Sequence, residues 1–239
     1  MKVFAHRGYS GKYPENTLLA FEKAVELKSD GIELDIHLSK DGKLVVIHDE
    51  KLIRTTGKPG KVSDYTLKEL KAINAGKTQN DKYGFTPIVD FQEYCDYISD
   101  KDIVTNIEIK TNNTYYSGIE EAALAMLKKY NLYDKVMFSS FNWLSIARIR
   151  TLAPSVETGL LQGGTSLLGN IGPLAALFGI NYFHPDGKLL TEDLVKNCRK
   201  NNIGLNVWTV NDLEMLAKLK QWKVNSVITN EPELMLKNL

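Results

Sequence analysis

The sequence predicts a single (β/α)8 TIM barrel, and three observations favour this fold class. The chain has 239 residues, close to the roughly 250 residues of a typical barrel of this kind. Short β-branched or apolar runs alternate with helical patterns, as expected for a parallel sheet whose faces are covered by helices. The content of 43% hydrophobic and 25% charged residues is typical of one globular unit. We therefore expect residues 1–239 to form one domain.

Strand-like and helical segments follow one another along most of the chain. The segments with strand character are residues 2–6, 31–39, 43–49, 102–110, 135–141, 157–162, 181–185, 203–210 and 225–230. The clearest amphipathic helices are residues 16–29, 117–130, 191–200 and 211–222. The first of these helices begins at Asn16, a common N-cap residue, and the second at Ser117, with Glu120 in the capping-box position.

A β-hairpin accounts for one strand more than an eight-stranded barrel requires. Asp41-Gly42 separates the strands at 31–39 and 43–49, and this dipeptide is a strong hairpin signal. The second barrel strand therefore has a hairpin extension. Across a two-residue turn Asp35 would pair with His48, and Glu33 would share the face of Asp35 because side chains alternate along a strand.

Residues 50–86 interrupt the alternation of strands and helices. This segment is polar and contains several glycines, with one helical piece at residues 66–73. It is too short to support a hydrophobic core of its own. We interpret residues 50–86 as a small insertion within the barrel domain.

Composition and charge argue against several classes of protein. Lys and Arg number 30 and Asp and Glu 29, so a formal charge of +1 provides no global attraction for nucleic acid or anionic membranes. No apolar run reaches the roughly 18 residues of a membrane-spanning helix, and the N-terminus has no secretory pattern. Cys95 and Cys198 form no CxxC motif, which is typical of a reducing compartment. The sequence therefore predicts a cytoplasmic protein with a small-molecule partner.

Charged side chains gather at the predicted strand ends. Active residues of barrels lie at the carboxyl ends of strands, and these ends carry His6, Arg7, Glu33, Asp35, His48, Glu108, Lys110 and Trp208. Three neighbouring carboxylates repel one another. A hard divalent cation, Ca²⁺ or Mg²⁺, would remove this repulsion because it prefers oxygen ligands.

The basic residues beside the carboxylates indicate an anionic substrate. A phosphate group would satisfy Arg7 and Lys110 together with the cation, because Arg offers a planar fork and Lys a point charge. His6 and His48 would supply a general acid and a general base. The residues therefore predict metal-assisted cleavage or transfer at a phosphate ester.

Several motifs resemble those of the glycerophosphodiester phosphodiesterase family, in the family's order and over nearly the whole chain. Residues 6–21 resemble its HRG…PENT motif and residues 33–57 its ExD…DG…HD segment. NIEIK, FSSF, NVWTVN and ITNEP resemble its later strand motifs. Their joint occurrence is specific, whereas any single motif is a weak signal. The residues after Phe85, TPIVDFQEY, depart from the family's common pattern.

The resemblance implies a reaction and a role for each matching residue. The reaction is cleavage of a glycerophosphodiester into glycerol 3-phosphate and an alcohol, by direct attack of water or through a cyclic phosphate. The implied roles are acid–base catalysis by His6 and His48, metal binding by Glu33, Asp35 and Glu108, phosphate binding by Arg7, charge stabilisation by Lys110, orientation of Arg7 by Glu15, and packing on the alcohol by Trp208. Which histidine is the acid stays open. We expect Asp49 to cap or orient His48 or its loop, and His37 and His184 to be structural.

Two other functions remain open from the sequence. A phospholipase acting on lysophospholipids or sphingomyelin would need an exposed apolar rim, and residues 166–179, SLLGNIGPLAALFG, are a modest candidate. A non-enzymatic barrel that senses phosphodiesters should have lost a histidine or a ligand residue. This chain retains all of them, so we rank the enzyme first.

Overall fold

The computed structural model describes residues 1–111, 114–163 and 171–239. Within these ranges, parallel strands close into a barrel because β1 (Lys2–His6) pairs with both β2 (Gly31–Leu38) and β10 (Ser226–Thr229). The remaining barrel strands are β5 (Val104–Ile109), β6 (Val136–Ser140), β7 (Glu157–Gln162), β8 (Tyr182–Pro185) and β9 (Gly204–Val207). The predicted eight-stranded barrel is confirmed.

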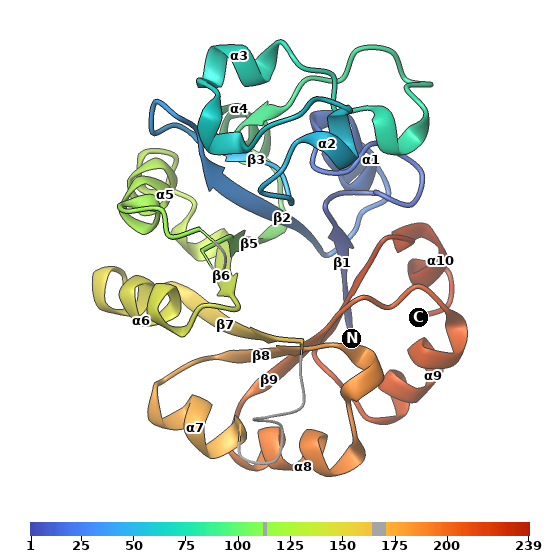
Figure 1. Ribbon diagram of the computed structural model, residues 1–239. Coiled ribbons are helices and arrows are strands. Elements are labelled where there is room, and N and C mark those ends of the chain that lie inside the picture. Colours follow the sequence, from blue (N-terminus) through green and yellow to red (C-terminus); the bar gives the residue numbers. More distant parts are fainter. Residues whose placement is uncertain (112–113, 164–170) are drawn as a thin grey trace.

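Helices surround the barrel (Figure 1). They are α1 (Leu18–Glu26), α4 (Phe91–Ile98), α5 (Ile119–Lys129), α6 (Trp143–Leu152), α7 (Ile171–Leu177), α8 (Glu192–Lys200), α9 (Leu213–Gln221) and α10 (Pro232–Leu236). Their apolar faces pack on the strands. Phe21 of α1 and Tyr94 of α4 are buried in one cluster with Ile32 and Ile107 of the sheet. Each such side chain stabilises the fold by about 1.5–3 kcal/mol.

Two helices begin later than the sequence predicts. Thr17, not Asn16, caps α1, because Asn16 has a left-handed φ of 55° and directs its side chain to the barrel. Gly118, with φ of 85°, takes the capping position of α5 in place of Ser117, so the predicted capping box is wrong. Glu120 is buried in the first turn of that helix.

The predicted hairpin extends β2 through β3 (Leu44–Val46), which pairs with a further short strand, β4 (Val89–Asp90). The sequence analysis missed β4 because two residues are too few to show an alternating pattern. β4 lies directly before α4, and Asp90 also caps that helix. The hairpin therefore becomes a small antiparallel sheet on one side of the barrel.

The hairpin register differs by one residue from the prediction. The loop contains three residues, 40–42, and Gly42 closes it with a left-handed φ of 70°. Ile47 N donates to Asp35 O at 3.0 Å, so Asp35 lies opposite Ile47 rather than His48. His48 follows the end of β3, and its side chain lies at the barrel mouth.

The insertion at residues 50–86 folds onto this hairpin, at the top of the view in Figure 1. It contains α2 (Ile53–Thr56), α3 (Leu67–Lys71) and the 3₁₀ turns Val62–Asp64 and Lys77–Gln79. Leu52 and Leu70 of the insertion share an apolar cluster with Val45 and Ile47 of the hairpin. The insertion therefore shares a core with the hairpin, and one domain over residues 1–239 stays a prediction.

Three sequence predictions concern surface and compartment. Among the described residues, no helix has the length and apolar character to cross a membrane. Residues 166–170 of the candidate apolar rim lie outside the described ranges, and the rest forms α7 and its C-terminus, where Phe178 is exposed. Cys95 and Cys198 are free and buried. The cytoplasmic location stays a prediction.

The barrel interior generates a prediction at Gly159 of β7. A Cβ atom there would lie 2.3 Å from His184 Nε2, and the imidazole is fully buried and 3.0 Å from Asn206 Nδ2. Gly159→Ala should therefore lower the free energy of unfolding, measured with urea, by about 1–3 kcal/mol. Gly163→Ala is the control, because its Cβ would approach no closer than 3.5 Å to a neighbour. Equal stabilities of the two variants would contradict this packing.

Candidate active site

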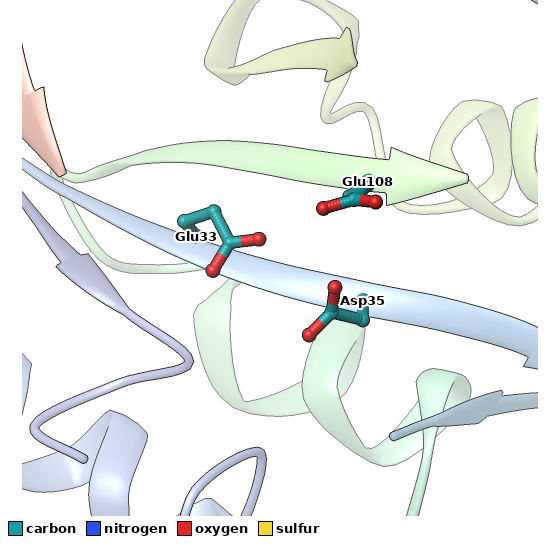
Figure 2. Close-up of side chains that lie close together, drawn as sticks. All are labelled: Glu33, Asp35 and Glu108. Carbon is teal, nitrogen blue, oxygen red and sulfur yellow. The ribbon is translucent and has the colours of Figure 1, made fainter. Parts of the chain in front are cut away.

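Three carboxylates meet at the barrel mouth because of strand register. Glu33 and Asp35 lie on β2, and Asp35 pairs with Glu108 of the neighbouring β5. Figure 2 shows the three side chains facing one another across these two strands. One oxygen atom from each residue lies within 4.8 Å of those from the other two. The predicted acidic cluster is therefore present, although the predicted hairpin register is wrong.

Burial strengthens the electrostatic repulsion among these three carboxylates. All three residues are at most 7% exposed. Burial, with the like charge of Asp35, raises the pKa of Glu33 well above its usual value, and burial also raises the pKa of Glu108. For Asp35, burial is outweighed chiefly by the attraction of Lys110, which holds the pKa well below its usual value. The all-oxygen donor set fits a hard divalent cation.

Two basic side chains border the carboxylates. Lys110 Nζ lies 2.6 Å from Glu108 Oε1 and 3.1 Å from Asp35 Oδ1. Arg7 Nε lies 3.5 Å from Asp35 Oδ2, and the Arg7 backbone N–H donates to Glu33 Oε2 at 3.0 Å. Burial would lower the pKa of Lys110, but Asp35 and Glu108 outweigh it and raise that pKa. Both side chains are therefore cationic and can hold an anion.

The two histidines have different hydrogen-bond partners. His6 Nδ1 lies 2.6 Å from the Asn230 amide oxygen, which accepts a hydrogen bond, so the proton of neutral His6 is on Nδ1. Burial lowers the pKa of His6 to about 3, which keeps the ring neutral. His48 Nδ1 lies 2.6 Å from the Asp49 carboxylate, and this contact fixes the orientation of the imidazole ring. The predicted orienting role of Asp49 fits this contact.

The predicted residues converge on one cavity of about 160 Å³. Its lining includes His6, Arg7, Glu33, His48, Glu108, Lys110 and Trp208. Glu15 lies behind the lining, where its Oε1 accepts from Arg7 Nη1 at 2.9 Å as expected. Asp35 lies behind it too, beside Arg7. A second cavity of about 580 Å³ shares His48 and Lys110 with the first.

The sequence analysis missed several residues at this site. Asn230 directly follows β10 and Phe141 directly follows β6, so the rule that strand ends carry active residues could have found both. Phe141 packs edge-on against Trp208, with ring centroids 5.8 Å apart. His37, which we expect to be structural, is buried, and its Nε2 lies 3.0 Å from the backbone oxygen of His48, so it helps to fix that residue.

Comparisons with known proteins agree with this geometry. The sequence model of the glycerophosphoryl diester phosphodiesterase family matches residues 6–234. The chain belongs to this family. It is 40% identical to a glycerophosphodiester phosphodiesterase of Caldanaerobacter subterraneus subsp. tengcongensis over 236 residues, which cover 98% of this chain and 96% of the relative. This membership supports the predicted glycerophosphodiester phosphodiesterase activity over the non-enzymatic alternative.

Solved structures of glycerophosphodiester phosphodiesterases share its fold. The Thermotoga maritima enzyme is 34% identical with a TM-score of 0.81, and the match covers 100% of this chain and 98% of that one. An Oleispira antarctica phosphodiesterase, solved in complex with the product sn-glycerol-3-phosphate, is 27% identical with a TM-score of 0.90. That match covers 99% of this chain and 96% of the other.

The contact between Asn16 and Asp35 generates a stability prediction. Asn16 Nδ2 donates to the buried Asp35 Oδ2 at 2.8 Å, and a hydrogen bond to a charged group contributes about 1.5–3 kcal/mol. Asn16→Ala should therefore lower the free energy of unfolding by more than Asn80→Ala. Asn80 is the matched control, because it has a similar left-handed φ of 52° but is exposed. Equal losses in thermal or urea unfolding would contradict a stabilising contact.

Proposed function

We propose that the protein hydrolyses glycerophosphodiesters to glycerol 3-phosphate and an alcohol, with a divalent cation and an acid–base pair of histidines. The observation that carries the proposal is the convergence of Glu33, Glu108, two basic side chains and two histidines on one cavity, with Asp35, the third member of the buried triad, directly behind its lining. The product sn-glycerol-3-phosphate in the Oleispira antarctica relative supports a small-molecule substrate of this class.

The cation would be held by Glu33, Asp35 and Glu108, and Ca²⁺ and Mg²⁺ both suit these ligands. When bound, such a cation polarises a phosphoryl oxygen and offsets its charge. The carboxylates come from two hydrogen-bonded strands, so the protein fixes their spacing before the substrate arrives. The phosphate then enters beside them.

Arg7 and Lys110 would bind the phosphate and stabilise the charge that grows on it in the transition state. Each contact of this kind contributes about 3 kcal/mol to catalysis. Glu15 and Asp35 hold the Arg7 guanidinium in place, so its orientation costs little at the moment of reaction. Trp208 and Phe141 form an apolar wall beside these groups, which would pack on the organic part of the substrate.

The different hydrogen-bond partners of His6 and His48 suggest which histidine carries out each proton transfer. His6 lines the cavity, and its Nδ1 is bound to Asn230, so Nε2 is the ring nitrogen that can accept a proton. We therefore assign His6 as the general base. It would take the proton of the attacking hydroxyl group, either of water or of the glycerol part of the substrate. His48 is the other histidine of the cavity, and the contact with Asp49 orients its ring, so we assign His48 as the general acid that protonates the leaving alcohol. Each transfer contributes about 10²–10⁴-fold to the rate.

Removal of the metal tests the role of the acidic triad. The chelator EDTA should abolish release of glycerol 3-phosphate from glycerophosphocholine, and Ca²⁺ or Mg²⁺ should restore it. The active ion should also raise the melting temperature of the wild type, because a ligand at 100 times its Kd stabilises by about 2.7 kcal/mol. Glu108→Gln should lose both responses, whereas Glu22→Gln on the exposed surface of α1 should keep them. Full activity in excess EDTA would refute the metal role.

A change of leaving group tests the histidine assignment. His48→Ala should lose about 10²–10⁴-fold in kcat toward glycerophosphocholine but much less toward a p-nitrophenyl diester, because nitrophenolate leaves without a proton. His6→Ala should lose comparable activity toward both substrates. The opposite pattern would exchange the two roles. Equal losses in both variants and for both substrates would contradict the division into acid and base.

A lipid substrate provides the comparison with the phospholipase alternative. We expect turnover of glycerophosphocholine and glycerophosphoethanolamine in the same panel of divalent ions. Preferential turnover of lysophosphatidylcholine presented in vesicles would favour the phospholipase instead.

A further inference from the structure

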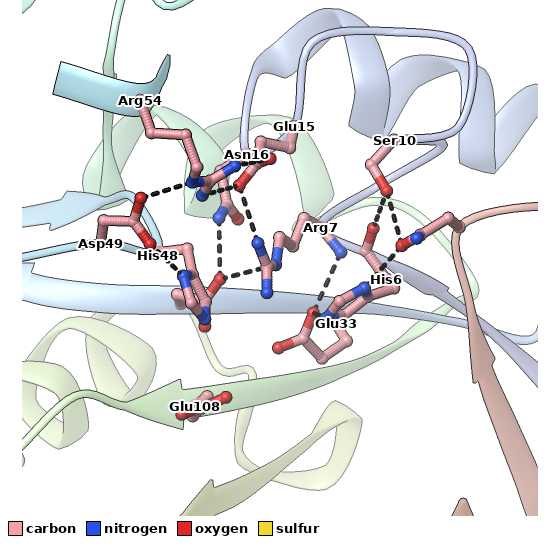
Figure 3. A network of polar contacts seen from close by, with 12 residues as sticks. His6, Arg7, Ser10, Glu15, Asn16, Glu33, His48, Asp49, Arg54 and Glu108 are labelled. Atoms are coloured by element: carbon pink, nitrogen blue, oxygen red, sulfur yellow. Dashed lines mark hydrogen bonds and ion pairs between the residues drawn. The ribbon is translucent and has the colours of Figure 1, made fainter. Parts of the chain in front are cut away.

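Arg54 joins two parts of the site that no strand connects. It lies on α2 of the insertion and reaches toward the loop between β1 and α1 (Figure 3). Its Nη1 and Nη2 donate to the two oxygens of Glu15 at 2.6 and 2.8 Å. Its Nε donates to Asp49 Oδ2 at 2.5 Å. One guanidinium therefore binds two carboxylates at once.

Each of these carboxylates also binds a residue of the proposed mechanism. Glu15 Oε1 accepts from Arg7 Nη1 at 2.9 Å, and Asp49 Oδ1 lies 2.6 Å from His48 Nδ1. The contacts form a continuous series, Arg7–Glu15–Arg54–Asp49–His48, in which each carboxylate binds two nitrogen-containing side chains. Both ends of the series line the same cavity.

We propose that Arg54 is a positioning residue that couples the phosphate-binding Arg7 to the acid–base residue His48. The proposal rests on the proposed function, because it concerns the orientation of two residues assigned there. The hydrogen bonds of Arg54 go to Glu15 and Asp49, which do not line the 160 Å³ cavity. Arg54 therefore acts on the cavity through these two carboxylates.

The chemistry of the guanidinium explains why an arginine suits this position. Its donors lie in one plane, so two of them can bind Glu15 while Nε binds Asp49. A lysine ammonium is a single point of charge and does not reproduce this three-point contact. Glu15 is only 11% exposed. Burial would raise its pKa, but the hydrogen bonds from Arg54, followed by the charge of Arg7, outweigh burial and lower it.

Stability alone does not account for Arg54. Its side chain is 42% exposed, so its ion pair with Asp49 contributes little to folding. Glu15 is more buried, but it keeps its hydrogen bond from Arg7 when Arg54 is replaced. The short helix α2 has other anchors. Leu52, which precedes it, is fully buried, and Thr56 Oγ1 donates to the Leu52 carbonyl at 2.8 Å. We therefore expect substitutions of Arg54 to leave the insertion folded.

Kinetics of the metal-loaded full-length enzyme separate the two ends of the series. Glu15→Gln should act mainly through Arg7 and raise KM for glycerophosphocholine, whereas Asp49→Asn should act mainly through His48 and lower kcat. Arg54→Gln should do both, by about tenfold each, with Arg54→Lys intermediate. Arg148→Gln is the control, because Arg148 is 44% exposed and forms an ion pair with Glu121. It should match the wild type.

A double-mutant cycle tests the coupling itself. The effects of Glu15→Gln and Asp49→Asn should be non-additive by at least about threefold in the wild-type background and additive once Arg54→Gln is present. Unchanged KM and kcat in Arg54→Gln, or a lower melting temperature as its only effect, would overturn the proposal.

A readout without turnover separates this proposal from the proposed function. In ¹⁵N-histidine NMR spectra, the Nδ1–H signal of His48 should shift or broaden in Arg54→Gln and not in Arg148→Gln. If the wild type is active and Arg54→Gln changes neither the kinetics nor the His48 signal, the coupling is overturned but the proposed function is not. A wild type without phosphodiesterase activity would overturn the proposed function, and an unchanged His48 signal would still count against Arg54.

Discussion

Repulsion among Glu33, Asp35 and Glu108 is the constraint on which the rest of the site depends. Three buried carboxylates with an oxygen atom each within 4.8 Å of the others destabilise one another unless positive charge lies nearby. Lys110 and Arg7 supply part of that charge through contacts with Asp35. A divalent cation would supply the rest. The same positive groups attract a phosphate, so one electrostatic requirement would account for both the proposed metal and the proposed substrate.

The barrel meets this requirement through strand register. His6 of β1 lies beside Glu33 of β2, and Asp35 of β2 lies beside Glu108 of β5. Parallel strands point their carboxyl ends the same way, so residues distant in sequence share one mouth. The insertion then packs on the hairpin and brings α2 next to the loop between β1 and α1, where Arg54 contacts Glu15 (Figures 1 and 3). The strands thus position the three carboxylates, whereas Glu15, Asp49 and Arg54, in loops and α2, orient Arg7 and His48.

The sequence predicted elements and strand-end residues better than it predicted side-chain partners. All nine strand segments are present because β-branched runs are a local property. The hairpin register was wrong because Lys40 joins Asp41 and Gly42 in a three-residue loop, which a two-residue turn signal does not reveal. Asn16 looked like a helix cap, yet its side chain binds Asp35. Arg54 lies within residues 33–57, which resemble a family segment, but its contact with Glu15 spans 39 residues and forms only when the insertion folds.

Anomalous scattering from crystals soaked in Mn²⁺ is the most direct test of the acidic triad as a cation site. The account predicts one strong peak within about 2.6 Å of an oxygen atom from each of Glu33, Asp35 and Glu108, with His6 and His48 on either side of the adjoining space. A peak elsewhere on the molecule, or none at saturating Mn²⁺, would contradict it.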